Sequence, residues 1–192
     1  MTQESSEVRA FGTGRVLVAA VGGTEPADIT ADFSHAVWTE LGHLSEAGPQ
    51  FSFGKARNPV VSWQSFPRPV RNLKGASPET VKFDLLQWNR HSIQLAFGGG
   101  TWSTDTTGAY RFTPPADEDV DYRALAVELV DGDYTYRFLF RKVENQAPAN
   151  FAAVATGLSP FPIEAVVLEP DSGAPWVIQT DDPNTTTAEA AS

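Results

Sequence analysis

The chain has 192 residues, of which 41% are hydrophobic and 11% aromatic, enough to build the core of one ordinary domain. It carries a formal net charge of −10 and no cysteine, which excludes disulfides and thiolate metal sites and argues against a protein that grips nucleic-acid phosphates. No stretch approaches the roughly 18 apolar residues that cross a bilayer, and the polar start predicts neither a signal nor a transit peptide. We therefore expect no membrane anchor and synthesis in a cytoplasm.

The first quarter of the chain predicts a flexible N-terminal segment and two strands. Residues 1–10 are polar and acidic, and residues 15–21 (RVLVAAV) form an apolar run that ends at two glycines, the signature of a buried strand and a turn. After a loop, residues 37–44 (VWTELGHL) alternate between apolar and polar side chains in part. We expect a second strand there.

Residues 49–78 differ in composition from the rest of the chain. They contain no aspartate or glutamate and five basic residues: Lys55, Arg57, Arg68, Arg71 and Lys74. Residues 60–66 (VVSWQSF) predict a strand, and Pro67 and Pro69 confine the residues after it to a sheet edge or a turn. This segment, here named the arm, is predicted to be an extended hairpin or loop that projects from the domain.

Residues 79–100 predict a strand that leads directly into the only helix we expect. Residues 79–88 alternate at the period of a half-buried strand, and Asn89 is a favourable N-cap residue. One helical apolar stripe comes next, formed by Ile93, Ala96 and Phe97. Three consecutive glycines, residues 98–100, end the helix because glycine adopts the left-handed C′ conformation without steric cost.

The second half of the chain predicts further strands. A polar loop comes after the glycines, and residues 110–114 form a short strand. Residues 122–130 and 133–143 flank Asp131-Gly132, a preferred two-residue hairpin turn. The second of these strands has no fully polar face, so we expect both of its faces to be covered. The last expected strands are 151–157, 161–168 and 176–180, and after them a low-complexity acidic tail, 181–192, that we expect to be disordered.

The sequence predicts no catalytic site, no cofactor and no metal site. His35, His43 and His91 are not spaced as metal ligands, and no serine-nucleophile or zinc-protease motif occurs. The acidic loop 117–121 could bind a hard cation such as Ca²⁺, but it lacks the glycine and the distal glutamate of an EF-hand. A solvated loop is the simpler interpretation, and we expect that the protein is not an enzyme.

The arm has three interpretations: a nucleic-acid contact, a docking element for another copy of the chain, or a solvated loop. The five tryptophans could form a carbohydrate-binding face, but packing in the core or between subunits explains them as well. Because the arm is positive and the rest of the chain is negative, we favour docking between copies. The candidate subunit-interface residues are Lys55, Arg57, Trp63, Arg68, Arg71 and Lys74.

Taken in order, several stretches of the chain resemble the tail tube protein (major tail protein) of long-tailed bacteriophages. They are FGTGRVLVAAVGGTEPAD, VWTELGHLSEAGP, a long arm, ETVKFDLLQWNRHSIQLAFGG, the strand YRALAVELVDG and a C-terminal set of strands punctuated by glycine and proline. No single piece is diagnostic, but the order and spacing cover most of the chain. Some relatives add an immunoglobulin-like domain at the C-terminus, and we expect no such domain after Thr180 here.

The resemblance implies a mainly β fold: a β-sandwich or barrel with one flanking helix, spanning residues 1–180 with the arm inserted. It also implies six-membered rings that stack into the tube for DNA ejection, with the arm contacting neighbouring rings. Tape-measure, tail terminator and baseplate proteins would be partners, and DNA would pass through an acidic lumen without specific binding. The alternatives are another ring-forming tail component, such as a tail terminator, and a soluble β-sandwich module that binds carbohydrate or protein.

Overall fold

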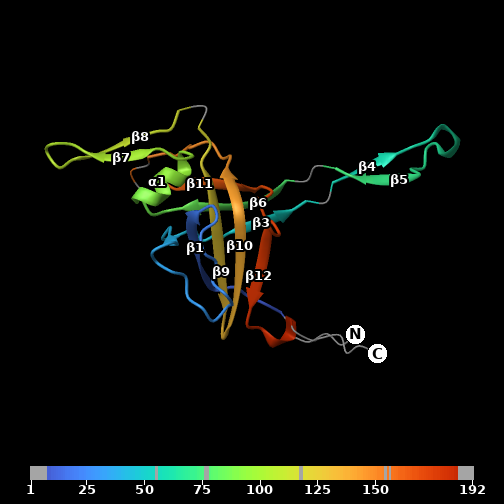
Figure 1. The fold of residues 1–192 in the computed structure, drawn as a ribbon, viewed down its shortest axis with the longest axis horizontal. Coiled ribbons are helices and arrows are strands. Elements are labelled where there is room, and N and C mark those ends of the chain that lie inside the picture. Colours follow the sequence, from blue (N-terminus) through green and yellow to red (C-terminus); the bar gives the residue numbers. More distant parts are fainter. Residues whose placement is uncertain are drawn as a thin grey trace.

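The computed structural model describes residues 8–54, 56–75, 78–116, 119–153, 155 and 157–185, and within them the protein is mainly β (Figure 1). Eight strands belong to one sheet, in which the neighbours along the main path are β2-β1-β9-β10-β11-β6-β3 and β12 pairs with β10. The bounds of these strands are β1 (Thr13–Ala20), β2 (Thr39–Glu40), β3 (Gln50–Phe53), β6 (Glu79–Leu85), β9 (Tyr122–Asp131), β10 (Tyr134–Asn145), β11 (Phe161–Val167) and β12 (Trp176–Thr180).

Strand β10 divides this sheet into the two layers of a sandwich. Its first half pairs with β12 from Tyr136 to Phe140, and its end pairs with β11 from Val143 onward. The pairing with β9 is irregular between Phe140 and Val143, and such an irregularity bends a strand and increases its twist. In Figure 1, β3, β6 and β11 accordingly run across β1, β9, β10 and β12. The predicted β-sandwich fold is confirmed.

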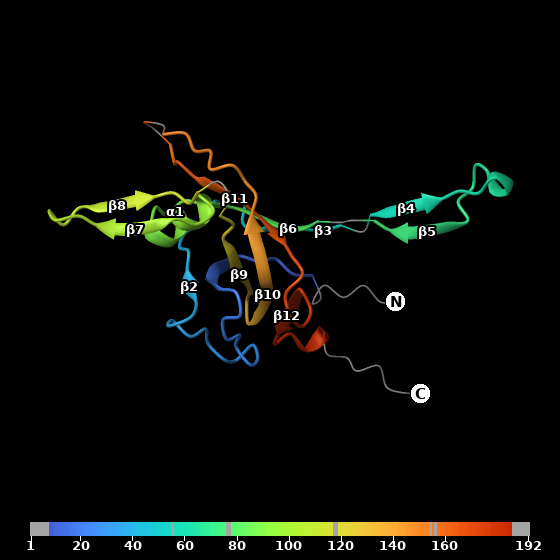
Figure 2. The same cartoon turned by 45° about the horizontal axis from the view of Figure 1, so that its top comes forward.

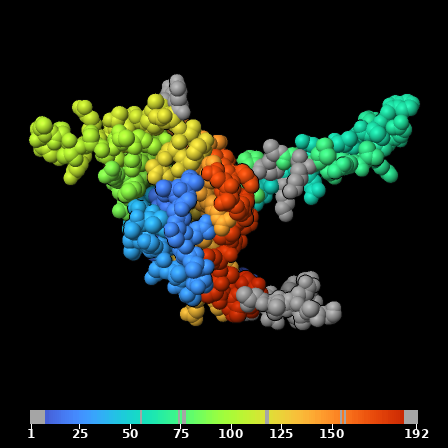
Figure 3. Space-filling model, viewed as in Figure 1, coloured from blue at the N-terminus to red at the C-terminus, as the bar shows by residue number. Residues whose placement is uncertain are grey.

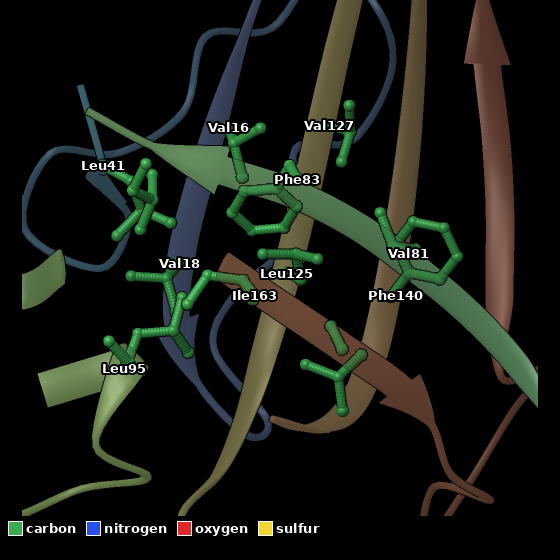
Figure 4. Packing of buried hydrophobic residues seen from close by; sticks show 14 of the residues in the cluster. Val16, Val18, Leu41, Val81, Phe83, Leu95, Leu125, Val127, Phe140 and Ile163 are labelled. Atoms are coloured by element: carbon green, nitrogen blue, oxygen red, sulfur yellow. The ribbon is translucent and has the colours of Figure 1, made fainter. Parts of the chain in front are cut away.

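The main hydrophobic core lies between the two layers. Figure 4 shows β1, β9 and β10 contributing side chains from one layer and β6 and β11 from the other. Fully buried members include Val16, Leu125, Phe140, Val81 and Phe161. In each strand these residues share one face, because successive side chains of a strand point to opposite sides.

A second, smaller core covers the opposite face of the β1-β9-β10-β12 layer. The loop between β1 and β2 crosses this face and places Phe33 and Trp38 over small residues such as Ala126. Trp38 Nε1 donates to the carbonyl of Thr24 at 2.8 Å, which ties the loop to itself. The mixed second face of β10 is thus covered by a loop of the same chain, as its buried Leu139 illustrates.

The helix α1 (Arg90–Ala96) begins at the predicted cap. Asn89 Oδ1 accepts from the backbone N–H groups of His91 and Ser92, both at 2.9 Å, and Ser92 Oγ accepts from the N–H of Asn89. The predicted apolar stripe is rotated, however. Leu95 and Ala96 are buried, Ile93 is half-buried and Phe97, already at the C-cap, is exposed.

Two separate hairpins project from opposite ends of the molecule (Figures 1, 2 and 3). One is the projecting part of the predicted arm, with β4 (Arg57–Val60), the 3₁₀ helix η2 (Trp63–Ser65) and β5 (Arg71–Lys74). The first residues of the predicted segment 49–78 do not project, because Gln50–Phe53 form β3 of the main sheet. The other consists of β7 (Thr101–Thr104) and β8 (Tyr110–Thr113) and lies beside α1.

Several local predictions are wrong. Residues 60–66 form the end of β4 and η2 rather than a strand, because Ser62 and Ser65 bond to each other around the turn. The segment 101–109 begins with β7 rather than being all loop. No strand lies in the described part of 151–157. Only Thr39–Glu40 of the second predicted strand pairs as β2.

The β9–β10 turn is also one residue later than predicted. Asp131 pairs with Tyr134, so the two loop residues are Gly132 and Asp133. Gly132 has φ +59°, and a type II′ turn places glycine at this first position.

The folded part of the chain extends beyond the last strand and past the predicted domain end at residue 180. Residues 181–185, which the sequence assigned to the tail, include the 3₁₀ helix η3 (Pro183–Thr185) and the buried Asp182. Residues 186–192 of the expected tail lie outside the described residues, as do Asp117 and Glu118 of the acidic loop.

Candidate functional site

The arm extends the β3–β6 pair of the sandwich. Phe53 of β3 pairs with Glu79 of β6, and farther out Arg57 of β4 pairs with Lys74 of β5. Between the two ladders the N–H of Gly75 donates to the carbonyl of Ala56 at 2.9 Å, so the two segments stay paired as they leave the body. At a rise of about 3.3 Å per residue, the seven steps from Phe53 to Val60, the end of β4, carry the chain roughly 20 Å from the sheet.

The six predicted interface residues all fall on this hairpin, although the structure describes them to different extents. Arg57 and Arg71 are exposed on β4 and β5, and Arg68 is exposed after η2. Lys74 pairs through its backbone with Arg57, and Lys55 lies outside the described residues. Paired positions lie on the same face of a two-stranded ribbon, and positions three residues apart along a strand lie on opposite faces. Because position 57 pairs with position 74, Arg57 and Arg71 are on opposite faces of the ribbon.

The positive charge of the arm is not neutralised within the described part of the chain. The ion pairs formed there join residues of the sandwich and its termini, and none includes Arg57, Arg68 or Arg71. Residues 49–78 carry +5 in sequence, so the rest of the chain carries −10 minus +5, or −15. The arm and the body are therefore electrostatically complementary, and Arg57, Arg68 and Arg71 form no ion pair with the described part of the body.

The tip of the arm is apolar as well as exposed. Trp63 is 91% exposed, Phe66 78% and Val70 62%. The backbone of the tip is nevertheless bonded, because the N–H of Arg68 donates to Ser65 and that of Val70 donates to Val60. A tryptophan held almost fully in solvent on a hydrogen-bonded turn is typical of a surface that another molecule covers.

Sequence reasoning selected Trp63 but not its apolar neighbours at the tip. The signal was present: residues 60–70 contain Val60, Val61, Phe66 and Val70 between prolines that exclude a core strand. Strand β7, which pairs with the predicted strand at 110–114 to form the β7–β8 hairpin, was missed as well. Its alternation was hidden by threonines and serines, which also favour turns.

The described residues contain no group of three or more His, Asp or Glu side chains placed to hold a metal ion. Partial burial, together with the charges of Arg90 and Arg123, lowers the pKa of His91, so this imidazole is neutral at pH 7. No described helix is long and apolar enough to cross a membrane.

Comparison with known proteins identifies a family for this chain. The model of a family described as "Phage tail tube protein" matches residues 1–190, nearly the whole chain. No curated protein matches the sequence.

Proposed function

The chain belongs to the phage tail tube protein family, and from this premise we propose that six copies close into a ring and that rings stack into the conduit for DNA ejection. Membership of the family gives the chain a structural role in the virion tail and assembly with copies of itself into a tube. Ring closure, the number six and the passage of DNA are our proposals.

The projecting arm is the observation that carries the proposal. An isolated two-stranded hairpin is at best marginally stable in water, and within the described residues Trp63, Phe66 and Val70 are left exposed at its tip. Such a hairpin gains stability when a second surface covers it. A neighbouring copy offers that surface, because the body of each copy is strongly negative and the arm is positive.

The charge of the body also suits a conduit for DNA. With the arm engaged between subunits, the remaining surface carries −15 in sequence, and like charge keeps phosphates from adhering to a wall. We further propose tape-measure, tail terminator and baseplate proteins as the partners that set the length and ends of the tube.

Negative-stain electron microscopy of the purified, concentrated protein tests the proposal. We expect rings or hollow tubes of uniform width, formed more readily at low salt, because screening weakens attraction between exposed charges. Dispersed monomers at every salt and protein concentration, with a cooperative melting transition that shows an intact fold, would contradict it.

A further inference from the structure

The most exposed apolar side chains gather at two opposite ends of the molecule. In the described residues, five large hydrophobic side chains are more than 70% exposed: Val8, Trp63, Phe66, Tyr110 and Leu158. Two belong to the tip of the arm. Tyr110 lies on β8 at the other end (Figure 1). Leu158 also belongs to that end, because the carbonyl of the next residue, Ser159, accepts a hydrogen bond from Trp88 Nε1, just before α1.

A groove lies at that second end, between α1 and the β7–β8 hairpin. It has a volume of about 350 Å³, and its apolar wall is formed by Trp88, Ile93, Trp102 and Tyr110. Arg90 also lines it. Pockets that hold small ligands or single anchoring side chains begin at roughly this size.

One polar atom of this wall has no partner. Trp102 Nε1 is buried and makes no hydrogen bond within the described part of the chain. The other tryptophan of the groove is satisfied, because Trp88 Nε1 donates to the carbonyl of Ser159 at 2.9 Å. Since buried indole N–H groups normally have an acceptor, Trp102 is the residue of this wall whose hydrogen bonding is incomplete.

We propose that this groove receives the tip of the arm, with Trp63 and Phe66 as anchors, from another copy of the chain. The inference rests on the proposed function and names the surface to which the arm binds. The tip and the groove lie at opposite ends of the longest axis (Figure 3), so one molecule cannot make the contact with itself. A contact between two different surfaces repeats from copy to copy, which suits rings and stacks.

The chemistry of the tip matches the groove. Residues 61–67 (VSWQSFP) contain no charged side chain, so the tip enters an apolar wall without desolvating an ion. Arg90 can lie over the Trp63 ring as a cation–π partner. Arg57, Arg68 and Arg71 remain outside the groove, where the negative body of the neighbour can attract them.

Cysteine cross-linking tests this contact directly, because the chain has no cysteine of its own. Gln64→Cys at the tip and Ser103→Cys in the groove are introduced into separate proteins, and both positions are exposed. The two proteins are mixed, assembled and oxidised gently, and then run on a non-reducing gel. Asp133→Cys, exposed in the β9–β10 turn, replaces Ser103→Cys in the matched control mixture.

We expect the Gln64→Cys and Ser103→Cys mixture to give a clear band of disulfide-linked dimer that the control mixture lacks. Some chains stay monomeric in both mixtures, because tips also dock on grooves without the cysteine. If tubes form but this dimer is absent, or no more abundant than in the control, the groove is not the receptor, whereas the proposed function stands. If the wild-type chain forms neither rings nor tubes, the proposed function fails, and the inference fails with it.

A second variant separates docking from folding. Trp63→Gln should leave the melting temperature of the dilute monomer unchanged, because the side chain is 91% exposed. We expect the concentration needed for assembly to rise by at least about tenfold, as for loss of a central tryptophan anchor. A critical concentration equal to that of the wild type would overturn the inference.

Discussion

The buried ion cluster of Arg15, Glu128 and Arg137 gives the sharpest test of how the fold is held together. It lies on the outer face of the β1-β9-β10-β12 layer, which the loop between β1 and β2 covers. Glu128 Oε1 accepts from Arg15 Nε at 2.7 Å, and Glu128 Oε2 accepts from Arg137 Nε and Nη2 at 3.0 and 2.9 Å. Arg137 is 2% exposed and Glu128 7%, so water cannot replace these partners.

We expect Glu128→Gln to destabilise the monomer by about 3 kcal/mol. Removing one partner of a buried ion pair costs roughly 3–5 kcal/mol, because the other charge is left uncompensated. The lower end applies here, since Arg137 keeps its bonds to the carbonyls of Asp28 and Ala31, at 2.9 and 3.1 Å. Glutamine also keeps one acceptor oxygen, although its amide then places a donor against a guanidinium.

Thermal unfolding of the dilute monomer, below the concentration at which it assembles, measures the effect. For a chain of this size each kcal/mol shifts the melting temperature by about 2–4 °C, so we expect a fall of roughly 6–12 °C. Glu164→Gln is the matched control, because Glu164 pairs with Lys82 at 3.0 Å through side chains that are 37% and 52% exposed. Such a pair contributes only about 0–1 kcal/mol. Equal shifts for the two variants would refute the reasoning.

Three further predictions concern the arm and the C-terminus. The triple variant Arg57→Glu, Arg68→Glu, Arg71→Glu should stop tube growth, as seen by electron microscopy, without lowering the melting temperature. The matched control, in which the same three arginines become lysine, should still form tubes. Normal tubes from the glutamate variant would exclude a role for the charge of the arm. Amide hydrogen exchange across the arm should be fast in the monomer and slow in the tube, and protection already present in the monomer would contradict docking. The hydrogen bond from the Tyr136 hydroxyl lowers the pKa of Asp182 in the folded protein. The ionised carboxylate therefore stabilises the fold above its unfolded pKa of about 3.9, and this stability is lost as pH falls through the folded pKa. Asp182→Asn should therefore melt below the wild type at pH 7, and this gap should narrow toward pH 2; a constant gap would show that ionisation is not involved.

The strongly patterned parts of the fold could be predicted because local chemistry and tertiary packing agree there. The β9–β10 hairpin is marked in the sequence by Asp131-Gly132, and Asn89 has the side chain that an N-cap requires. The two-layer arrangement was harder, because it depends on the irregularity between Phe140 and Val143 that passes β10 from one layer to the other. A bulge of this kind leaves no clear mark in a single sequence.

The buried ion cluster could not be found from the sequence for a similar reason. Arg15, Glu128, Arg137 and Gln179 stand directly opposite one another on four neighbouring strands, and that row exists only once the register is known. Without the register, the arginines of β10 indicated only that its second face is mixed. The structure also shows what covers these side chains: the centroid of the Phe33 ring, on the β1–β2 loop, lies 4.4 Å from the guanidinium of Arg137.

The arm was located by its charge, and its structure shifts the emphasis to its apolar tip. Exposed ion pairs contribute little one at a time and are screened by salt, whereas burying an aromatic side chain contributes several times more. We therefore assign steering and register to Arg57, Arg68 and Arg71, and most of the affinity to Trp63 and Phe66. Salt should then slow the growth of tubes far more than it dissolves tubes already formed. Rapid dissolution of mature tubes by salt alone would reverse this assignment.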